Sequence, residues 1–139
     1  MHAFLDAIAD AVNPLFALTA IIVVALDLRR GRWRSLSATA LGVAGIYVVM
    51  FADRSLHLWQ RYHADYSTHT AFATTLTVSL MVLRPAWRPA LLGVWIAYLA
   101  LIVFLRYHSA GDVIVAAMIA IIVTLPWHYV FYSSPFSRT

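Results

Sequence analysis

The stretch "AGDVIVAAMIAIIVTLPWHYVF", residues 110–131, decides the fold class of this chain. It is long and apolar enough to cross the hydrocarbon core of a bilayer as a helix, which takes roughly 20 residues. Four further segments qualify: 14–28, with an amphipathic lead-in from Phe4, then 37–51, 67–83 and 90–107. The sequence predicts an all-α, polytopic membrane helix bundle of about five transmembrane helices. The linkers are too short for a second domain, so one integral-membrane domain is expected over residues 1–139.

The composition agrees with a chain that lies mostly in lipid. Hydrophobic residues make up 63% of the sequence and charged residues only 12%, against roughly a quarter in soluble domains. The absence of cysteine excludes disulfides and thiolate metal sites. The formal charge of +4 comes from arginines in short interhelical connections, so it indicates membrane topology and no nucleic-acid partner.

Arginine placement predicts the orientation of the bundle. The connections "RRGRWRS" at 29–35 and "RPAWRP" at 84–89 fall on one face, which the positive-inside rule makes cytoplasmic. The N-terminus is then outside and the C-terminus inside. Exclusive use of arginine as the basic residue suggests a GC-rich genome, so we expect a bacterial inner membrane. Three arginines remain on the outer face without a topological explanation: Arg54, Arg61 and Arg106.

Two connections on the outer face hold most of the remaining ionisable groups. They are "DRSLHLWQRYHADYSTHT" at 53–70 and "RYHSAGD" at 106–112. Ionisable groups at a membrane edge are costly unless they are solvated or paired, so their density favours a functional site. The group includes Asp53, Arg54, His57, Arg61, His63, Asp65, Ser67, His69, Arg106, His108 and Asp112.

Two short patterns within this group have both a structural and a functional interpretation. Asp112 lies one helical turn after His108, where a carboxylate could fix the imidazole tautomer and leave a nucleophilic nitrogen, or simply cap a helix. Ser67 is a plausible N-cap, and the N–H groups that follow form an anion site beside His69; alternatively His69 is only interfacial. The convergence of both histidines with three arginines on one face favours binding of a phosphate-like oxyanion.

These residues resemble the three motifs of the type 2 phosphatidic acid phosphatase superfamily. Arg54 and Arg61-Tyr62 are similar to its Lys-x6-Arg-Pro, and Ser67-Thr68-His69 is similar to its Ser-Gly-His. The run His108 to Asp112 is similar to the end of its Arg-x5-His-x3-Asp. Thr68 stands where the family has glycine, and Ile102 stands where it has the upstream arginine, for which Arg106 would substitute. The latter departure is closer to the sphingomyelin-synthase-like branch.

The resemblance implies a metal-independent lipid phosphatase that needs no cofactor. His108 would be the nucleophile that forms a phosphohistidine, Asp112 would orient it, and His69 would be the general acid and then the base. The substrate would be a lipid phosphomonoester or diphosphate held at the extracytoplasmic face, with membrane lipids as its surroundings. The expected phosphate-binding residues are Arg54, Arg61, Ser67, Thr68 and Arg106.

Three alternatives remain open at this point. A lipid phosphotransferase of the sphingomyelin-synthase-like type would use the same residues with a different acceptor. A relative without activity would bind the lipid phosphate only, since shared ancestry of a site does not prove activity. A metal or haem site would use His57, His63, His69 and His108, although the arginines would repel a cation.

Other features have structural explanations. We expect Thr68, Thr70, Thr74, Thr75 and Thr77, with Ala71 and Ala73, to pack helix against helix. Asp27 is expected to pair with Arg30 three residues later. Trp33, Trp87 and the segment "PWHYVFY" at 126–132, including His128, are expected in interfacial aromatic belts. His2, Asp6 and Asp10 carry no recognisable signal.

Overall fold

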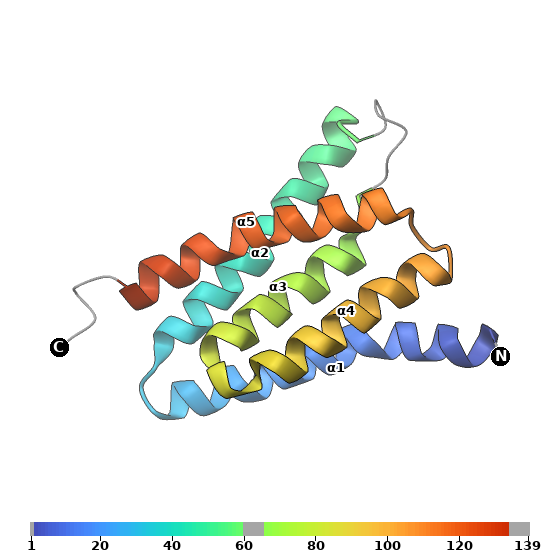
Figure 1. The fold of residues 1–139 in the computed structure, drawn as a ribbon. Coiled ribbons are helices and arrows are strands. Elements are labelled where there is room, and N and C mark those ends of the chain that lie inside the picture. Colours follow the sequence, from blue (N-terminus) through green and yellow to red (C-terminus); the bar gives the residue numbers. More distant parts are fainter. Residues whose placement is uncertain (1, 60–65, 134–139) are drawn as a thin grey trace.

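The computed structural model describes residues 2–59 and 66–133 of the chain. Five helices pack as one bundle (Figure 1), which confirms the predicted all-α class. A short 3-10 turn, η2 (Pro85–Trp87), leads into the fourth helix. The five helices are α1 (His2–Arg29), α2 (Trp33–Leu56), α3 (Thr68–Leu83), α4 (Arg88–Phe104) and α5 (Ala110–Ser133).

Four of these helices are long and apolar enough to cross a membrane, namely α1, α2, α4 with its leading turn, and α5. Large apolar side chains are exposed along their outer surfaces, among them Ile21, Val48, Ile96 and Ile122, and no soluble protein would leave so many in water. The chain is therefore a membrane-embedded protein. The third helix, α3, has 16 residues and spans about 24 Å, less than the ~30 Å hydrocarbon core.

The short helix α3 lies at the centre of the bundle and packs against all four others (Figure 1). The predicted helix-packing role of its threonines is confirmed, because Thr70, Thr74, Thr75 and Thr77 are all buried. Two of these hydroxyls tie α3 to its neighbours, and the first is that of Thr75, which accepts from Thr124 of α5 at 3.1 Å. Trp95 of α4 donates its indole N–H to Thr74 at 3.0 Å. Buried hydroxyls that are bonded in this way hold the helices together without leaving polar groups unpaired in lipid.

Two glycines let α2 approach α5 closely. A Cβ at Gly42 would lie 3.1 Å from Cγ2 of Thr124, and a Cβ at Gly45 would collide with the side chain of Val123. Small residues at such crossings allow backbones to approach closely, which is how helices gain packing energy in a bilayer. The sequence alone does not mark these glycines as contacts between α2 and α5.

Several helix boundaries differ from the prediction. The first helix was expected to span the membrane from Pro14, with an amphipathic lead-in from Phe4, and α1 runs without a break from His2 through Pro14 to Arg29. Apolar spans of membrane helices tolerate proline because neighbouring groups satisfy the freed carbonyl. The second helix was expected over 37–51, and α2 extends past both ends, to Trp33 and Leu56. Hydropathy marks only the lipid-buried part of a helix, so it misses turns that continue beyond it.

The fourth helix was expected to reach residue 107, but α4 ends at Phe104. Arg106 adopts a left-handed conformation (φ 58°). The Arg106 N–H donates to the carbonyl of Val103 at 3.0 Å, and the Tyr107 N–H donates to that of Ile102 at 3.2 Å. This pair of bonds is a Schellman motif, which usually has glycine at the left-handed position. Because an arginine occupies this position instead of glycine, the helix end could not be predicted from the sequence.

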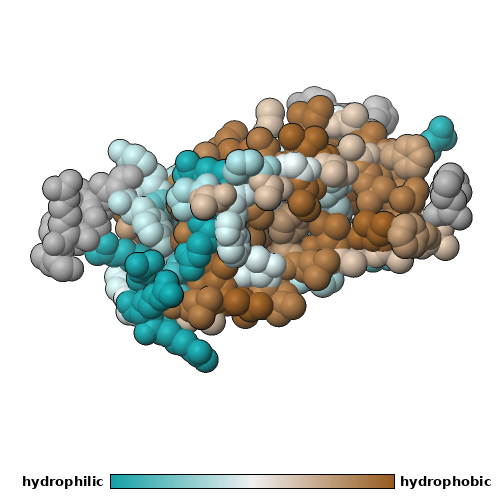
Figure 2. Space-filling model, turned by 60° about the horizontal axis from the view of Figure 1, so that its bottom comes forward, coloured by the Kyte–Doolittle hydropathy of each residue, from teal (hydrophilic) through white to brown (hydrophobic). Residues whose placement is uncertain are grey.

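The two ends of the bundle differ in character. The arginine end comprises the α1–α2 connection, the α3–α4 connection and the last turn of α5, and hydrophilic residues gather there, on the left of Figure 2. The histidine end comprises the start of α1, the end of α2, the start of α3 and the connection from α4 to α5. Apolar surface covers most of the face between them in Figure 2, as expected for lipid contact.

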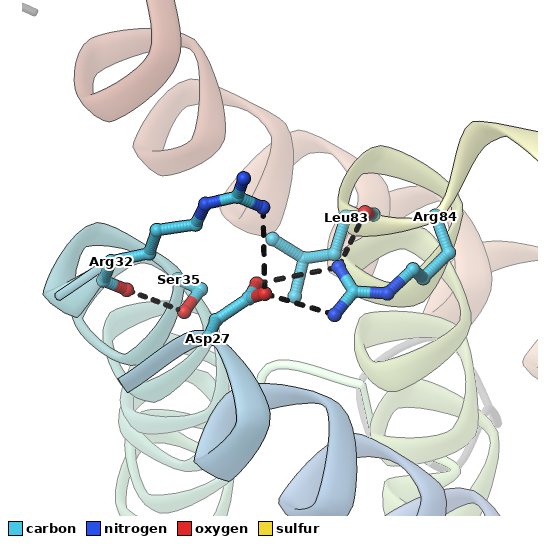
Figure 3. A network of polar contacts seen from close by, with 5 residues as sticks. All are labelled: Asp27, Arg32, Ser35, Leu83 and Arg84. Atoms are coloured by element: carbon cyan, nitrogen blue, oxygen red, sulfur yellow. Dashed lines mark hydrogen bonds and ion pairs between the residues drawn. The ribbon is translucent and has the colours of Figure 1, made fainter. Parts of the chain in front are cut away.

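Asp27 has a different partner from the one predicted. Its side chain is 2% exposed, and Arg84 donates to both carboxylate oxygens, at 2.9 and 3.4 Å (Figure 3). Arg32 adds a longer contact of 3.8 Å. The expected pair with Arg30 is wrong: the Arg30 backbone N–H donates to the Asp27 carbonyl as part of the helix end. Asp27 continues the buried face of α1 through Phe16, Ala20 and Val23, so its carboxylate points inward rather than along the helix surface.

The expectation that His128 lies in an interfacial belt is also wrong. His128 is 2% exposed, and its Nε2 is hydrogen-bonded to the hydroxyl of Ser79 at 2.9 Å. It continues the buried face of α5 that passes through Ala116, Ala120 and Thr124, at the three- and four-residue spacing of a helix. The helical period of α5 would have predicted this burial, whereas the aromatic neighbours of His128 in sequence suggested the opposite.

Candidate functional site

Two connections that are distant in sequence meet at the histidine end and enclose a cavity of about 520 Å³. The structure brings together His69, from the first turn of α3, and His108, which precedes α5. Arg54, from the last turn of α2, completes the charged part of the wall. We call this space the Arg54 cavity, and it is lined by Met50, Asp53, Arg54, Tyr66, Thr68, His69 and His108.

The end of α2 has a defined geometry that positions Arg54. His57 caps the helix in a left-handed conformation (φ 53°), and its N–H donates to the Asp53 carbonyl at 2.7 Å. The Asp53 carboxylate accepts the N–H of Trp59 at 2.9 Å, which turns the chain back after the helix. Arg54 therefore lies in a helix end that is held by hydrogen bonds. Its neighbour Asp53 uses its carboxylate to accept the backbone N–H of Trp59 in the turn that follows.

Tyr66 is a member of the cavity wall that the sequence did not single out. It is 6% exposed, and its hydroxyl has no hydrogen-bond partner among the described residues. Burial raises the pKa of the phenol to about 12, with a further contribution from the negative charge of Asp53. The phenol therefore stays protonated, and its hydroxyl is a buried donor without a partner among the described residues.

Ser67 confirms its predicted role as the N-cap of α3. Its oxygen accepts the Thr70 N–H at 3.4 Å, and its hydroxyl donates to the Thr70 hydroxyl at 2.8 Å. Ser67 is fully buried and does not line the cavity, whereas Thr68 and His69 do. The cap orients the first turn of α3 so that these next two side chains face the cavity.

The start of α5 is closed by a reciprocal cap. The N–H and hydroxyl of Ser109 donate to Asp112 Oδ2 at 3.0 and 2.7 Å, and the Asp112 N–H donates to the Ser109 hydroxyl at 3.1 Å. The capping interpretation of this segment is therefore confirmed. The same bonds fix the Asp112 carboxylate in the first turn of α5, directly after His108.

Among the described residues, two more of the predicted set, Arg106 and Asp112, are not in the cavity wall. Arg106 is exposed and lines neither this cavity nor the one described next. Its backbone conformation departs from the usual range for a side chain with a Cβ, which costs roughly 1–2 kcal/mol. Arg61 and His63 lie outside the described residues. Of the five predicted phosphate-binding residues, the structure places Arg54 and Thr68 beside the two histidines.

A second cavity of about 490 Å³ shares His69 and His108 with the Arg54 cavity. We call it the Asp10 cavity. Asn13 donates its amide N–H to the Tyr98 hydroxyl at 3.1 Å, and the Asn13 Oδ1 is buried without a partner among the described residues. His69 and His108 line both the Asp10 cavity and the Arg54 cavity. The Asp10 cavity is lined by Ala9, Asp10, Asn13, Pro14, His69, Tyr98, Ile102, Tyr107 and His108.

Two carboxylates place negative charge beside the Asp10 cavity: Asp10 lines it, and Asp6 is hydrogen-bonded to Tyr107, which also lines it. The Tyr107 hydroxyl donates to Asp6 at 2.8 Å, and this bond, with the negative charges of Asp6 and Asp10, raises the pKa of Tyr107. The sequence carried no readable signal at Asp6 or Asp10. Their relevance arises only because the N-terminal part of α1 packs beside the α4–α5 connection, as Figure 1 shows.

The described part of the chain holds no group of three histidine or acidic side chains arranged to bind a metal ion. No protein-family model, curated protein or solved structure matches the sequence or the fold. The chemistry of the two cavities is therefore inferred from their own residues.

Proposed function

We propose that this protein is a membrane-embedded lipid phosphate phosphatase that works through a phosphohistidine. One observation carries the proposal: His69, His108 and Arg54, from three separate parts of the chain, line one cavity at the histidine end. A phosphoryl group needs positioning and charge neutralisation more than elaborate covalent chemistry. Two imidazoles and a guanidinium supply a nucleophile, a proton donor and an electrostatic clamp.

In the first step, His108 attacks the phosphorus of the lipid phosphate in line with the ester oxygen. The bond from phosphorus to this oxygen breaks, and His69 gives the leaving alkoxide its proton. Asp112, which the reciprocal cap with Ser109 holds one turn away, orients the His108 ring. Arg54, with the neutral Tyr66 phenol and the Thr68 region, stabilises charge on the non-bridging oxygens.

In the second step, His69 accepts a proton from water as the water oxygen attacks the phosphohistidine. The bond from phosphorus to nitrogen breaks, inorganic phosphate leaves and both histidines return to their starting states. The nucleophile, the general acid and base, and one cation of the water route all line the Arg54 cavity. Arg106 remains a proposed further cation for the phosphate, and Ser67 contributes by capping the start of α3. Arg61, proposed from the sequence for the same role, lies outside the described residues.

A second candidate function is transfer of the phosphoryl group to another lipid hydroxyl. The Asp10 cavity favours it, because a bound alcohol there would reach the same two histidines from the side opposite Arg54. Asn13 Oδ1 and the Asp10 carboxylate are acceptors suited to an alcohol hydroxyl. Adding acceptor lipids to the assay distinguishes the two functions, since transfer yields a new lipid phosphate in place of inorganic phosphate.

We also propose that the histidine end faces the extracytoplasmic side, because the arginine end carries the cytoplasmic signature of short basic connections. The chain has no cysteine, so single cysteines report topology without background. A membrane-impermeant maleimide added to intact cells should label Leu58→Cys at the histidine end and leave Ala86→Cys unlabelled. The reverse pattern would invert the proposed orientation.

The principal experiment measures phosphate release from lipid mono- and diphosphates by the detergent-purified protein without added metal. His108→Ala and His69→Ala should each lower the rate by at least ~10²-fold if they act as nucleophile and general acid. Equal rates in wild type and His108→Ala would remove His108 from the chemistry. Binding of lipid phosphate without release or transfer would identify a binding protein with no activity.

Two control variants separate the chemistry from the architecture. His57→Gly removes a histidine from the same end but outside both cavities, and glycine suits the left-handed conformation of that residue, so activity should persist. Arg106→Gly should raise the free energy of unfolding by about 1 kcal/mol, since it relieves the left-handed strain at the end of α4. A loss of activity in this stabilised variant would show that the Arg106 guanidinium takes part.

A further inference from the structure

One face of α1 passes from polar to apolar as it leaves the histidine end. Asp10, Asn13 and Pro14 line the Asp10 cavity, while Ala17, Val24 and Leu28 line an apolar groove of about 600 Å³. These positions recur at intervals of three, four or seven residues, so they lie on the same side of the helix. The cavity and the groove are therefore consecutive parts of one surface of α1.

The central helix shows the same progression. His69 lines the Asp10 cavity, and Phe72 and Leu76, three and seven residues further on, line the groove. On the far side, α2 closes the groove with Ala40 and Ala44. Thus α1 and α3 both lead from the histidines toward the arginine end. Among the described residues of the groove wall, Thr39 alone carries a hydroxyl.

We propose that this surface is the binding track of an amphiphilic substrate. The phosphate lies at the two histidines, a hydroxyl- or ester-bearing backbone lies against Asn13, and one hydrocarbon chain occupies the groove between α1 and α2. The inference rests on the proposed function and adds the place where the hydrocarbon chain of the lipid phosphate binds and a preference for long chains. The groove follows the polar cavity along the same faces of α1 and α3, which favours it as the place for a substrate chain.

The length of the track predicts the length of the hydrocarbon chain that it can hold. From Asn13 to Leu28 it runs about 22 Å along α1 at the helical rise per residue. One leaflet is about half of the ~30 Å hydrocarbon core, so the track continues beyond the bilayer midplane. Long-chain substrates should therefore be preferred over short-chain ones with the same phosphate.

The first test narrows the groove from its lipid-exposed wall. Ala40→Phe should lower kcat/KM for a long-chain lipid phosphate about tenfold or more, which is the scale on which apolar pockets discriminate small changes of shape. Turnover of a water-soluble phosphate ester should stay within about twofold of wild type, since it needs only the cavities. Ala97→Phe, an equally exposed alanine on α4 outside the groove and both cavities, is the matched control. Equal effects of both variants, or none, would overturn the proposal.

The second test reads binding without turnover. A lipid phosphate carrying a photoactivatable group near its chain end should label peptides from α1 and α2 in both wild type and His108→Ala. Labelling in the groove without phosphate release would refute the phosphatase and leave the track standing. Release with labelling elsewhere would refute the track and leave the phosphatase standing. Equal labelling by a probe without phosphate would assign the groove to bulk lipid, and conversion of a dimer to a monomer by Ala40→Phe would assign it to a second copy.

Discussion

The buried ion pair at the arginine end gives a sharp prediction about stability. Arg84→Met removes the main partner of Asp27, a carboxylate that is 2% exposed and whose Oδ1 lies 2.9 Å from Nη2 of Arg84. Arg32 remains at 3.8 Å, but its side chain is 62% exposed, so it compensates only weakly. Leaving one partner of a buried pair without the other costs about 3–5 kcal/mol. Because Arg84 is itself 22% exposed, we expect a loss near the lower limit, about 3 kcal/mol.

Replacing the other partner of the pair, Asp27, should reduce the free energy of unfolding by less. In Asp27→Leu the guanidinium of Arg84 keeps its 2.7 Å bond to the Leu83 carbonyl and its access to solvent (Figure 3). We expect a loss of about 1 kcal/mol, typical of one net hydrogen bond. The double variant should be more stable than Arg84→Met alone, since no buried charge is left unpaired.

The assay is reversible unfolding in mixed micelles, with the denaturing detergent titrated and helix content followed by circular dichroism. All three variants are compared with wild type at one ionic strength. The reasoning would be refuted if the free energy of unfolding of Arg84→Met lies within about 1 kcal/mol of the wild-type value, which is about the error of such measurements. It would also be refuted if Asp27→Leu were the more destabilised single variant.

Three further substitutions should destabilise the bundle in the same assay. Gly45→Val places a side chain against Val123 where α2 meets α5 and should cost about 1–3 kcal/mol; unchanged stability would mean that the helices separate freely. His128→Ala removes a buried ring and leaves the Ser79 hydroxyl without its partner, a loss of about 2 kcal/mol, and a neutral result would argue that water replaces the ring. Ser109→Ala removes the cap of α5 and should cost about 1 kcal/mol, while no loss would show that other groups satisfy the first turn.

Local chemistry explains which structural predictions were accurate. Ser67 caps α3 as expected, because a serine before an apolar run satisfies the free N–H groups of a first turn. The threonine face of α3 was recognisable because small and hydroxylated residues have few other uses in a membrane helix. The end of α4 was missed since Arg106 occupies a position that usually announces itself with glycine.

Some residues of the candidate site could be predicted from the sequence, and others could not. His69, His108 and Arg54 were identifiable from their density at one membrane edge, where ionisable groups are costly without a purpose. Tyr66 was not, because a tyrosine near a membrane surface is ordinary until its hydroxyl is seen buried in a cavity. Asn13 was not either, since nothing in its own segment indicates that α1 packs beside His69.

Apolar helices of membrane-spanning length and ionisable residues in the connections can be predicted from the amino-acid sequence, because hydropathy and charge act through local composition. Which side chains meet depends on tertiary packing. Asp27 pairs with Arg84, 57 residues away, instead of Arg30, and His128 turns inward to Ser79. The helical period determines the face of the helix on which a residue lies. The neighbour on that face depends on how the other helices pack, and residue spacing within one segment does not predict it.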